Sequence, residues 1–419
     1  MKVHLYGNTL NNSYNLTQFL RAKGIEAEMF LDDLSPSVQD YPWWEDRGIN
    51  KENFPSWIHY YPTRPFFLLP NKKVRQMIDD FSKCDVALVC CYGPIVAMKA
   101  KIPFVFYAIG SDLNCINLHE ELMLILKTKL PITRKIMRLV KILTYRPLQV
   151  KAIKKCANLI LVLMGYQVNP YLKKNDLLFK TLKARLLWDI KKYSPKVDLV
   201  LNEKYKKYDI VFFMIARHNH SSIWNDLKGN DKFLRAFANF INCKDQPNVK
   251  LVLINKGDDV NLSKNIIEDY EFEEYVEWVE QMDKDGIRSY ESLSNVVVVD
   301  QFWHNEWYKR YPEDNEKPVM GFGSGSIEAM SASRPLITVF FDEDFYNGET
   351  PPIFTAFTEE EILQRLNQCY EMTVLEREQM GKKGREFVLK YHHWENNIDM
   401  YIDALKKVVN VNLGSDIKK

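Results

Sequence analysis

The first half of the chain alternates short apolar runs with longer amphipathic segments. Unbroken apolar runs are typical of parallel strands that are buried on both faces, and the amphipathic segments between them are typical of covering helices. The pattern predicts helices at 14–23 and 73–81 and strands at residues 3–6, 27–31, 86–91, 104–108 and 159–164. The stretch 35–70 is rich in loops and aromatic residues, and we expect it to pack locally or to line a cleft.

The second half of the chain starts the same rhythm again. It predicts a helix at 232–240, a largely helical tail at 359–405, and strands at 210–215, 249–254, 296–299 and 336–341. Two successive series of strands and helices predict an α/β protein with two Rossmann-like, doubly wound parallel-sheet domains that face a central cleft.

The length of 419 residues also favours two domains, because it exceeds what one hydrophobic core usually supports. We expect an N-terminal domain at 1–200 and a C-terminal domain at 201–392, joined by a polar linker at 193–208. Residues 393–419 are expected to form a C-terminal helix and tail that cross back to the first domain.

Ligands of open parallel sheets bind beyond the carboxyl ends of the strands. In two facing sheets these ends meet at one cleft, so the loops that follow the strands are the first places to look for a site. These loops are 7–12, 110–112, 217–228, the segment from 300 onward and 321–328.

Composition narrows the class of protein. Apolar residues make up 46% and charged residues 27%, which excludes a disordered or fibrous chain. The seven cysteines form no C-x-x-C pair, so a zinc ribbon or disulfide framework is not expected and a reducing compartment fits best. No apolar run is long enough to cross a bilayer, and the first residues begin directly with strand alternation. We therefore expect a cytoplasmic protein.

The charge is unevenly distributed, although the net charge is only +2. Residues 127–196 carry 18 Lys and Arg against two Asp, so this segment is suited to a negative partner. The stretch 130–146 has helical spacing, with Arg134, Arg138 and Lys141 on one face. Apolar side chains occupy the opposite region, namely Ile136, Leu139, Val140 and Leu143.

Such a helix suits peripheral contact with an anionic membrane, which we expect through 130–155 at the inner face of the cytoplasmic membrane. The alternative is a surface helix whose apolar stripe faces the core. Nucleic acid is not an expected partner, since aromatic residues are not interleaved with the basic residues.

The segment 321–326, Gly-Phe-Gly-Ser-Gly-Ser, opens a predicted helix. Small residues leave the first backbone amides uncovered, and the helix dipole adds positive charge there, which predicts an anion site. Glu328 follows within about the first turn, where a carboxylate can accept hydrogen bonds from sugar hydroxyls. The alternative is an ordinary helix start in which Glu328 only complements the dipole.

Two cations follow the predicted strand 210–215. Arg217 comes directly after it, and Lys228 precedes the next helix. An Arg fork and a Lys point charge on adjacent loops suit a diphosphate, although both could also be solvated loop cations. His218 and His220 have a spacing that can bind metal, but no third ligand lies beside them in the sequence, so no metal site is expected.

Together these segments resemble the GT-B glycosyltransferases, and within them the retaining enzymes of glycosyltransferase family 4. The resemblance rests on Arg217, Lys228-Gly229 and the later run 321–337, with its Gly-Phe-Gly, Glu-Ala-Met and Arg-Pro-Leu-Ile elements. It implies that Arg217 and Lys228 bind the diphosphate of a nucleoside-diphosphate sugar and that Glu328 binds the nucleotide ribose. The donor is then a substrate, and no cofactor is expected.

The resemblance also assigns roles in the first half. The loop around Asp112 is similar to the one that approaches the transferred sugar, and 7–13 is similar to the loop that faces the phosphates. The candidate catalytic residues are therefore Asp112 and Glu328. The candidate donor-binding residues are Gly7, Asn8, Asn12, Arg217, Lys228, Asp300, Gly323, Ser324, Gly325, Ser326 and Glu328.

One position departs from the family pattern. The family places a second Glu eight residues before the one at 328, where this chain has Met320. A methionine cannot accept strong hydrogen bonds from the donor sugar. Acidic or polar residues that could substitute are Asp300, Gln301, Glu306, Glu313, Asp314 and Glu316.

We therefore interpret the chain as a glycosyltransferase that moves a hexose to a surface-glycan or lipid-linked acceptor, with retention at the anomeric carbon, as in lipopolysaccharide or capsule synthesis. Two alternatives stay open: a catalytically silent GT-B subunit, for which Met320 is the argument, and a nucleotide-sugar epimerase.

Overall fold

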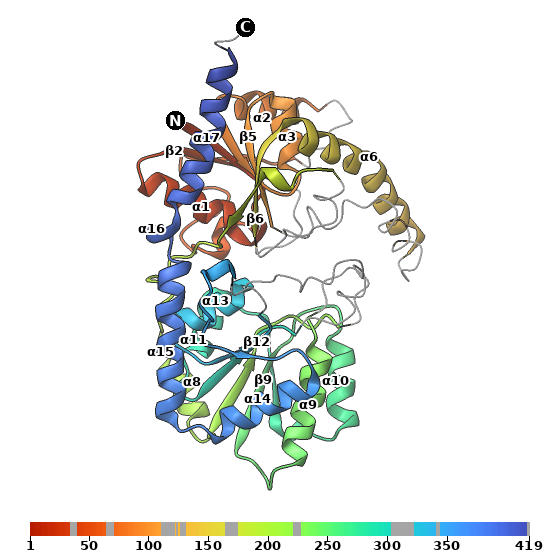
Figure 1. The fold of residues 1–419 in the computed structure, drawn as a ribbon. Coiled ribbons are helices and arrows are strands. Elements are labelled where there is room, and N and C mark those ends of the chain that lie inside the picture. Colours follow the sequence, from red (N-terminus) through yellow and green to blue (C-terminus); the bar gives the residue numbers. More distant parts are fainter. Residues whose placement is uncertain are drawn as a thin grey trace. The chain divides into compact units, whose positions relative to one another are not determined.

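The computed structural model describes most of the chain in two compact units (Figure 1). The N-terminal unit comprises Met1–Trp188 together with Trp394–Lys419, and the C-terminal unit comprises Asp189–His393. The described residues are 1–33, 40–63, 71–109, 122, 125, 131–163, 175–220, 228–302, 322–340 and 344–416.

The division between the units lies before the predicted boundary at residue 200. The segment 193–208, predicted as a linker, belongs to the C-terminal unit. Tyr205 is fully buried there, and its carbonyl accepts a hydrogen bond from the Asn295 side chain at 3.1 Å. Buried aromatic residues thus hold this Lys-rich segment against the second core, which its polar sequence did not indicate.

The N-terminal unit contains a parallel sheet of seven strands within the described residues, in the order β3-β2-β1-β4-β5-β6-β7. Val86–Val89 and Phe104–Ala108 are buried along their whole length, as expected for central strands covered on both faces. The strands are β1 (Lys2–Tyr6), β2 (Glu26–Asp32), β3 (Ile58–Tyr61), β4 (Val86–Val89), β5 (Phe104–Ala108), β6 (Ala157–Leu163) and β7 (Thr181–Ala184). β3 lies inside the aromatic stretch 35–70, which we predicted to be rich in loops and for which we predicted no strand.

The helices of this unit are α1 (Asn12–Ala22), α2 (Lys72–Phe81), α3 (Gly93–Ala100), α6 (Ile132–Cys156), α16 (Trp394–Asn397) and α17 (Asp399–Asp416). Short 3-10 turns occur at Thr9–Asn11, Pro42–Trp44 and Leu178–Lys180. α1 packs on β2, α3 packs on β4 and β5, and α17 packs against β4, β5 and β6.

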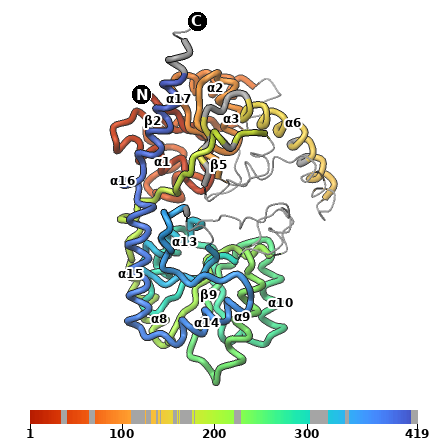
Figure 2. The backbone as a smooth tube through the Cα atoms, viewed as in Figure 1, coloured from red at the N-terminus to blue at the C-terminus, as the bar shows by residue number. Residues whose placement is uncertain are grey.

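The tail of the chain belongs to this first unit. The ring of Trp394 stacks on Phe19 with centroids 5.1 Å apart, and Tyr401 meets Tyr107 edge to face at 5.6 Å. The Tyr401 hydroxyl donates to the Arg185 carbonyl at 2.7 Å. The chain therefore returns from the second unit to complete the first, as its blue C-terminal end among red and orange elements shows (Figure 2).

α6 continues through Pro147, beyond the stretch that we predicted as helical. Proline removes one helical hydrogen bond, but buried side chains on both sides of it hold the helix in place. Tyr145, Gln149 and Ile153 face the unit's core, whereas the apolar side chains of Ile132, Ile136, Val140 and Leu143 are exposed. None of the helices in the described part of the chain combines the length and apolar character needed to span a membrane.

The C-terminal unit contains a parallel sheet of six strands within the described residues, in the order β10-β9-β8-β11-β12-β13. Its strands are β8 (Ile210–Met214), β9 (Val249–Ile254), β10 (Val276–Val279), β11 (Val296–Val299), β12 (Leu336–Thr338) and β13 (Phe354–Thr355). Its helices are α8 (Leu199–Tyr205), α9 (Asn230–Asn242), α10 (Val260–Asp269), α11 (Lys284–Glu291), α13 (Ser324–Ser331), α14 (Glu359–Glu371) and α15 (Val374–Tyr391), with 3-10 turns at Glu273–Tyr275 and Asp344–Tyr346.

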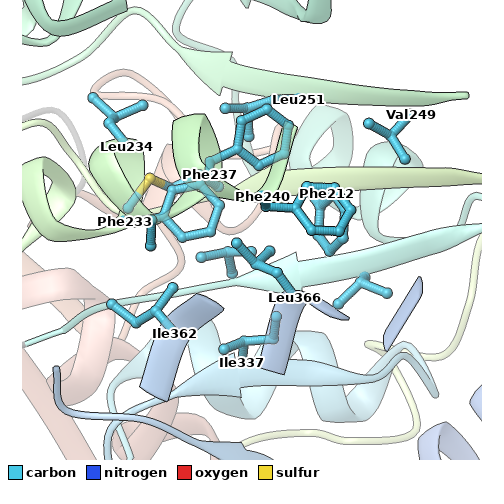
Figure 3. Packing of buried hydrophobic residues seen from close by; sticks show 14 of the residues in the cluster. Phe212, Phe233, Leu234, Phe237, Phe240, Val249, Leu251, Ile337, Ile362 and Leu366 are labelled. Carbon is cyan, nitrogen blue, oxygen red and sulfur yellow. The ribbon is translucent and has the colours of Figure 1, made fainter. Parts of the chain in front are cut away.

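The core of this unit lies between the sheet and the helices α9 and α14 (Figure 3). Phe212 of β8 meets Phe237 and Phe240 of α9 edge to face, at centroid distances of 5.9 and 6.0 Å. Ile362 and Leu366 of α14 are fully buried in the same cluster. Burial of such large apolar side chains fixes α9 on the sheet and thereby fixes the loop at its N-terminus.

Candidate functional site

The candidate site lies at the carboxyl ends of β8, β9 and β11 in the C-terminal unit. β8 pairs with β9 on one side and with β11 on the other, and the strand order reverses direction between β8 and β11. Such a reversal is the position at which doubly wound sheets bind ligands. Asp300 directly follows β11, and Arg217 and Lys256 lie within three residues of the ends of β8 and β9.

Backbone hydrogen bonds fasten the loops of this edge to one another. The amide of His218 donates to the Lys256 carbonyl at 2.7 Å, which joins the loops after β8 and β9. The amide of Lys228 donates to the Asn219 carbonyl, and the amide of Phe302 donates to the Lys228 carbonyl, both at 2.7 Å. The segments that carry the cations are therefore held side by side by the main chain.

Two glycines make this close approach possible. Gly229 has φ +67, and a Cβ atom there would lie 1.6 Å from the Phe302 carbonyl oxygen. Gly257 has φ +124, and its Cβ would lie 2.4 Å from the His218 carbonyl oxygen. Any other residue would be strained in backbone conformation and would also separate the loops.

Three cations gather on these loops. Arg217 is exposed, whereas Lys228 and Lys256 are half-buried, and the Lys228 ammonium donates to Gln301 Oε1 at 2.9 Å. Removal from water, with a further contribution from the charge of Arg217, lowers the pKa of Lys228 and that of Lys256 to about 8. Positive charge is thus concentrated at an edge where an anion would relieve the repulsion.

The start of α13 lies against the same edge. A Cβ atom on Gly325 would lie 2.4 Å from Ile215 Cδ1, and one on Gly323 would lie 3.1 Å from Gln301 Nε2. Glycine at these positions therefore lets the helix start approach the ends of β8 and β11. Gly323 and Ser324 are half-buried, and the N-cap residue Gly323 supplies no capping side chain.

Asp300 is engaged at this helix start. It is buried, and its Oδ2 accepts a hydrogen bond from Ser326 Oγ at 2.6 Å. Burial raises the pKa of Asp300, while the hydrogen bonds from Ser326 and the charge of Lys228 oppose the increase. Asp300 thus anchors the first turn of α13 to the end of β11 and helps to place Lys228.

Glu328 lies one turn further along α13 and forms an ion pair. Its Oε1 is 3.2 Å from the Lys284 ammonium, with both side chains about seven-eighths buried. Lys284 also donates to the Tyr193 hydroxyl at 3.2 Å. Beneath them, burial and the charges of Glu328 and Asp300 raise the pKa of Glu291, which favours its neutral form. Lys284 therefore orients Glu328, a contact that the sequence did not reveal.

His218 and His220 share one partner rather than a metal-ligand arrangement. Both rings contact Ser263 Oγ, at 2.7 Å from His218 Nδ1 and 3.0 Å from His220 Nε2. Burial is the main cause that lowers the pKa of His218, to about 3, so this ring is neutral. Within the described residues, no group of three or more metal-ligating side chains occurs.

The candidate residues of the N-terminal unit lie at the end of β1. Gly7 has φ +88, and a Cβ there would lie 2.6 Å from the Cys90 carbonyl oxygen. The Asn8 amide nitrogen donates to Asn11 Oδ1 and to the Asp40 carbonyl, both at 2.8 Å. Its oxygen accepts from the Tyr14 amide at 2.9 Å, so Asn8 holds the start of α1.

Asn12 is the first residue of α1, and its side chain donates to the Thr9 carbonyl at 2.9 Å. Asp112, Met320 and the acidic segment 303–319 lie outside the described residues.

The structure therefore gathers the predicted residues of the C-terminal unit on one edge. These are Arg217, Lys228, Asp300, Gly323, Ser324, Gly325, Ser326 and Glu328. Lys256 joins them, although the sequence analysis did not select it. Its signal was the position it shares with Arg217, a cation shortly after the end of an apolar strand.

Comparisons with known proteins give a fold rather than a family. No protein-family model matches the chain, and no curated protein matches it either. Among solved structures, Anabaena HepE in complex with UDP and glucose has a TM-score of 0.64 at 14% identity, covering 97% of this chain and 100% of that one.

Two further structures are similar over nearly their whole length. A glycosyltransferase from Rickettsia africae has a TM-score of 0.62 at 12% identity, covering 97% of this chain and 98% of that one. Sucrose-phosphate synthase from Thermosynechococcus elongatus has a TM-score of 0.60 at 13% identity, covering 98% and 100%. The chain has the fold of these proteins, with two Rossmann-like parallel-sheet domains of the GT-B class, as predicted.

Proposed function

We propose that the chain is a glycosyltransferase of the retaining, metal-independent kind, which transfers a hexose from a nucleoside-diphosphate sugar. The observation that carries the proposal is the cluster of Arg217, Lys228 and Lys256 on loops that the main chain locks together. Its position at the strand-order reversal is where a diphosphate would lie. The UDP and UDP-glucose complexes of HepE, which has the same fold, agree with this class of donor.

The chemistry required of the cluster is charge stabilisation. When the bond between the anomeric carbon and the β-phosphate oxygen breaks, negative charge grows on the departing nucleoside diphosphate. Arg217 and Lys228, together with the dipole of α13, would stabilise that charge in a transition state more than in the ground state. In this mechanism Glu328, held by Lys284, accepts hydrogen bonds from the ribose.

A thermal-shift screen against UDP-, GDP- and ADP-sugars tests donor binding. We expect one class of donor to raise the melting temperature of the wild type, and Arg217→Ala to lose most of that shift. Lys250→Met is the matched control, because Lys250 lies at the start of β9 and donates to the Glu274 carbonyl at 2.9 Å. The absence of a shift with every donor would contradict the proposal.

Met320 keeps a second function under consideration, a catalytically silent nucleotide-binding or partner subunit. A nucleotide-sugar epimerase is the third. Incubation of the bound donor with and without acceptor separates them: a transferase forms a glycoside whose anomeric configuration matches the donor, an epimerase converts the donor alone, and a silent subunit does neither.

For the acceptor we propose a surface glycan or a lipid-linked glycan, presented at an anionic membrane that α6 contacts. Ile132, Ile136, Val140 and Leu143 recur at helical spacing and are between 47% and 74% exposed. Exposed Arg134 and Lys151 accompany them. Apolar exposure of this extent, next to cations, suits insertion at the level of lipid headgroups.

Vesicle flotation tests the membrane contact. We expect the protein to float with vesicles that contain phosphatidylglycerol and to stay in solution with vesicles of phosphatidylcholine alone. The double variant Ile136→Asp, Val140→Asp should lose flotation while it keeps its donor-induced thermal shift. Equal flotation of this variant would show that α6 is not the contact.

A further inference from the structure

Lys256 has a fixed place in the cation cluster. Its carbonyl accepts the His218 amide at 2.7 Å, and its own amide donates to the Ile254 carbonyl at 2.7 Å. The next residue, Gly257, lies so close to the His218 backbone that a Cβ atom would not fit. The backbone at Lys256 is therefore held beside the loop of Arg217, and the residue is half-buried there.

The two lysines share Arg217 as a neighbour but have different acidic neighbours. Lys228 interacts electrostatically with Arg217 and Asp300, and its ammonium is bonded to Gln301 at the end of β11. Lys256 interacts electrostatically with Arg217 and Glu328, on α13. Arg217 is thus the neighbour that they share, with Asp300 toward one lysine and Glu328 toward the other.

Given the proposed donor site, the different acidic neighbours of the two lysines indicate which phosphate each lysine would contact. If Glu328 holds the ribose, the group next to the ribose is the α-phosphate of the nucleotide, and the β-phosphate lies one bond further away. Lys256, which neighbours Glu328, would therefore meet the α-phosphate, and Lys228, which neighbours Asp300 and bonds to Gln301, would meet the β-phosphate. Charge-assisted contacts to phosphate oxygens are strong and directional.

We propose that Lys256 is a third donor-binding residue and binds the α-phosphate at the junction with the ribose. The proposal rests on the proposed function, because it takes a nucleoside diphosphate as the ligand. It assigns Lys256 a specific readout. Loss of the Lys256 charge should weaken the binding of nucleoside monophosphates and diphosphates alike. Loss of the Lys228 charge should weaken the binding of diphosphates selectively.

The experiment measures dissociation constants by titration calorimetry for the nucleoside mono- and diphosphate of the base that the wild type selects. The variants are Lys256→Met, Lys228→Met and the charge-retaining Lys256→Arg, with Lys250→Met, on the strand that precedes Lys256, as the control. We expect Lys256→Met to raise the dissociation constants of both nucleotides about tenfold, because one charge-assisted contact is lost. Lys228→Met should raise the dissociation constant of the diphosphate about tenfold and that of the monophosphate less than about twofold.

Two further measurements distinguish a binding role of Lys256 from a structural role. Lys256→Arg should recover most of the affinity. Lys256→Met should melt at the same temperature as the wild type or higher without nucleotide, because it removes an ammonium that burial and, to a lesser extent, the charge of Arg217 disfavour. A destabilised Lys256→Met that Lys256→Arg does not rescue would assign the residue a structural role and overturn the proposal.

The remaining outcomes are also decisive. Wild-type affinity of Lys256→Met for both nucleotides would overturn the role of Lys256 alone, provided that Arg217→Ala loses binding. A selective loss of the diphosphate in Lys256→Met would overturn the assignment to the α-phosphate. If the wild type binds no nucleotide of any base, the proposed function fails, and this inference fails with it.

Discussion

The sheets of the two units share one strand order over six strands, but the loops at their carboxyl ends have different chemistry. In the C-terminal unit, Arg217, Lys228 and Lys256 concentrate positive charge that burial and mutual repulsion make costly. In the N-terminal unit, the loop after β1 carries Gly7 and Asn8, and three internal hydrogen bonds engage the Asn8 amide group. In our proposal the cationic edge receives an anion, whereas the Asn8 side chain at the other edge bonds to its own loop.

The two units have the same sheet topology over six strands but different side chains on their loops. The parallel sheet brings strand ends and helix starts to one edge in both units, and side chains on the loops then decide what that edge binds. In the first unit polar groups stabilise the loop itself. In the second unit, backbone hydrogen bonds join the loops that carry the cations, and the Lys228 ammonium also bonds to Gln301.

The largest expected effect concerns the glycine that locks the second edge. Gly229→Ala should lower the free energy of unfolding by several kcal/mol, about 3 or more, because a left-handed backbone and a carbonyl contact are both violated. Gly24→Ala is the matched control, with φ +77 and no atom within 4 Å of the added Cβ, and should cost only about 1 kcal/mol. Chemical denaturation measures both, and equal losses would mean that the Phe302 contact is easily relieved.

The next effect compares the two edges directly. Arg217→Ala should weaken nucleoside-diphosphate binding about a hundredfold, through loss of a bidentate charged contact, with little change in melting temperature. Asn8→Ala should instead lower stability by about 1–2 kcal/mol, because the start of α1 loses its side-chain hydrogen bond. Calorimetry and thermal melts on both variants would reveal the reverse pattern if the anion site lay in the N-terminal unit.

The pH dependence sharpens the same contrast. The pKa values of Lys228 and Lys256 are about 8, so raising the pH through 8 removes the charges that bind the anion. Nucleotide affinity should therefore fall above pH 8. Stability of the nucleotide-free protein should receive the opposite contribution: the unfolded state binds more protons than the folded state between pH 8 and the ordinary lysine pKa near 10.5, so these two lysines favour folding as the pH rises.

Affinity titrations and thermal melts from pH 7 to about 10 measure both trends. The Lys228→Met, Lys256→Met double variant is the control. An affinity that falls equally steeply in this double variant would assign the pH dependence to other groups.

The smallest expected effect concerns the ribose. Glu328→Gln keeps the size of the side chain but removes the ion pair with Lys284, and it should reduce the preference for a ribonucleotide over its 2′-deoxy analogue about fivefold. Lys284→Met should reproduce part of this loss, since it releases Glu328. Competition binding with the two nucleotides measures the preference, and an unchanged ratio in Glu328→Gln would place the ribose elsewhere.

The sequence predicted the central strands well because they are buried on both faces. Ile210–Met214 and Val296–Val299 are unbroken apolar runs, and the structure buries every residue in them. Strands near the sheet edge gave no such signal. β10 consists of Val-Glu-Trp-Val and is half-buried throughout, and β7 carries an exposed lysine, so both read as polar segments.

The candidate site was predictable from the sequence where the type of a residue and its position in the pattern together indicate its chemistry. Arg217 and Lys228 follow apolar strands or precede helices, which the pattern alone revealed. Asp300 was selected for its position, but whether it binds a ligand or a helix start depends on Ser326, a contact 26 residues away. The ion pair of Glu328 with Lys284 likewise depends on how α11 and α13 pack, which no local pattern encodes.

The return of the chain at Trp394 has a consequence for biosynthesis. The C-terminal unit is continuous in sequence, so all of its residues have been synthesised once His393 has left the ribosome. Residues 1–188 of the N-terminal unit are translated before the C-terminal unit, yet Phe19 and Tyr107 pack against Trp394 and Tyr401, which are made after it. The N-terminal unit is therefore completed only after the C-terminal unit has been made, and a fragment that stops at residue 393 would leave an apolar face of the first sheet uncovered.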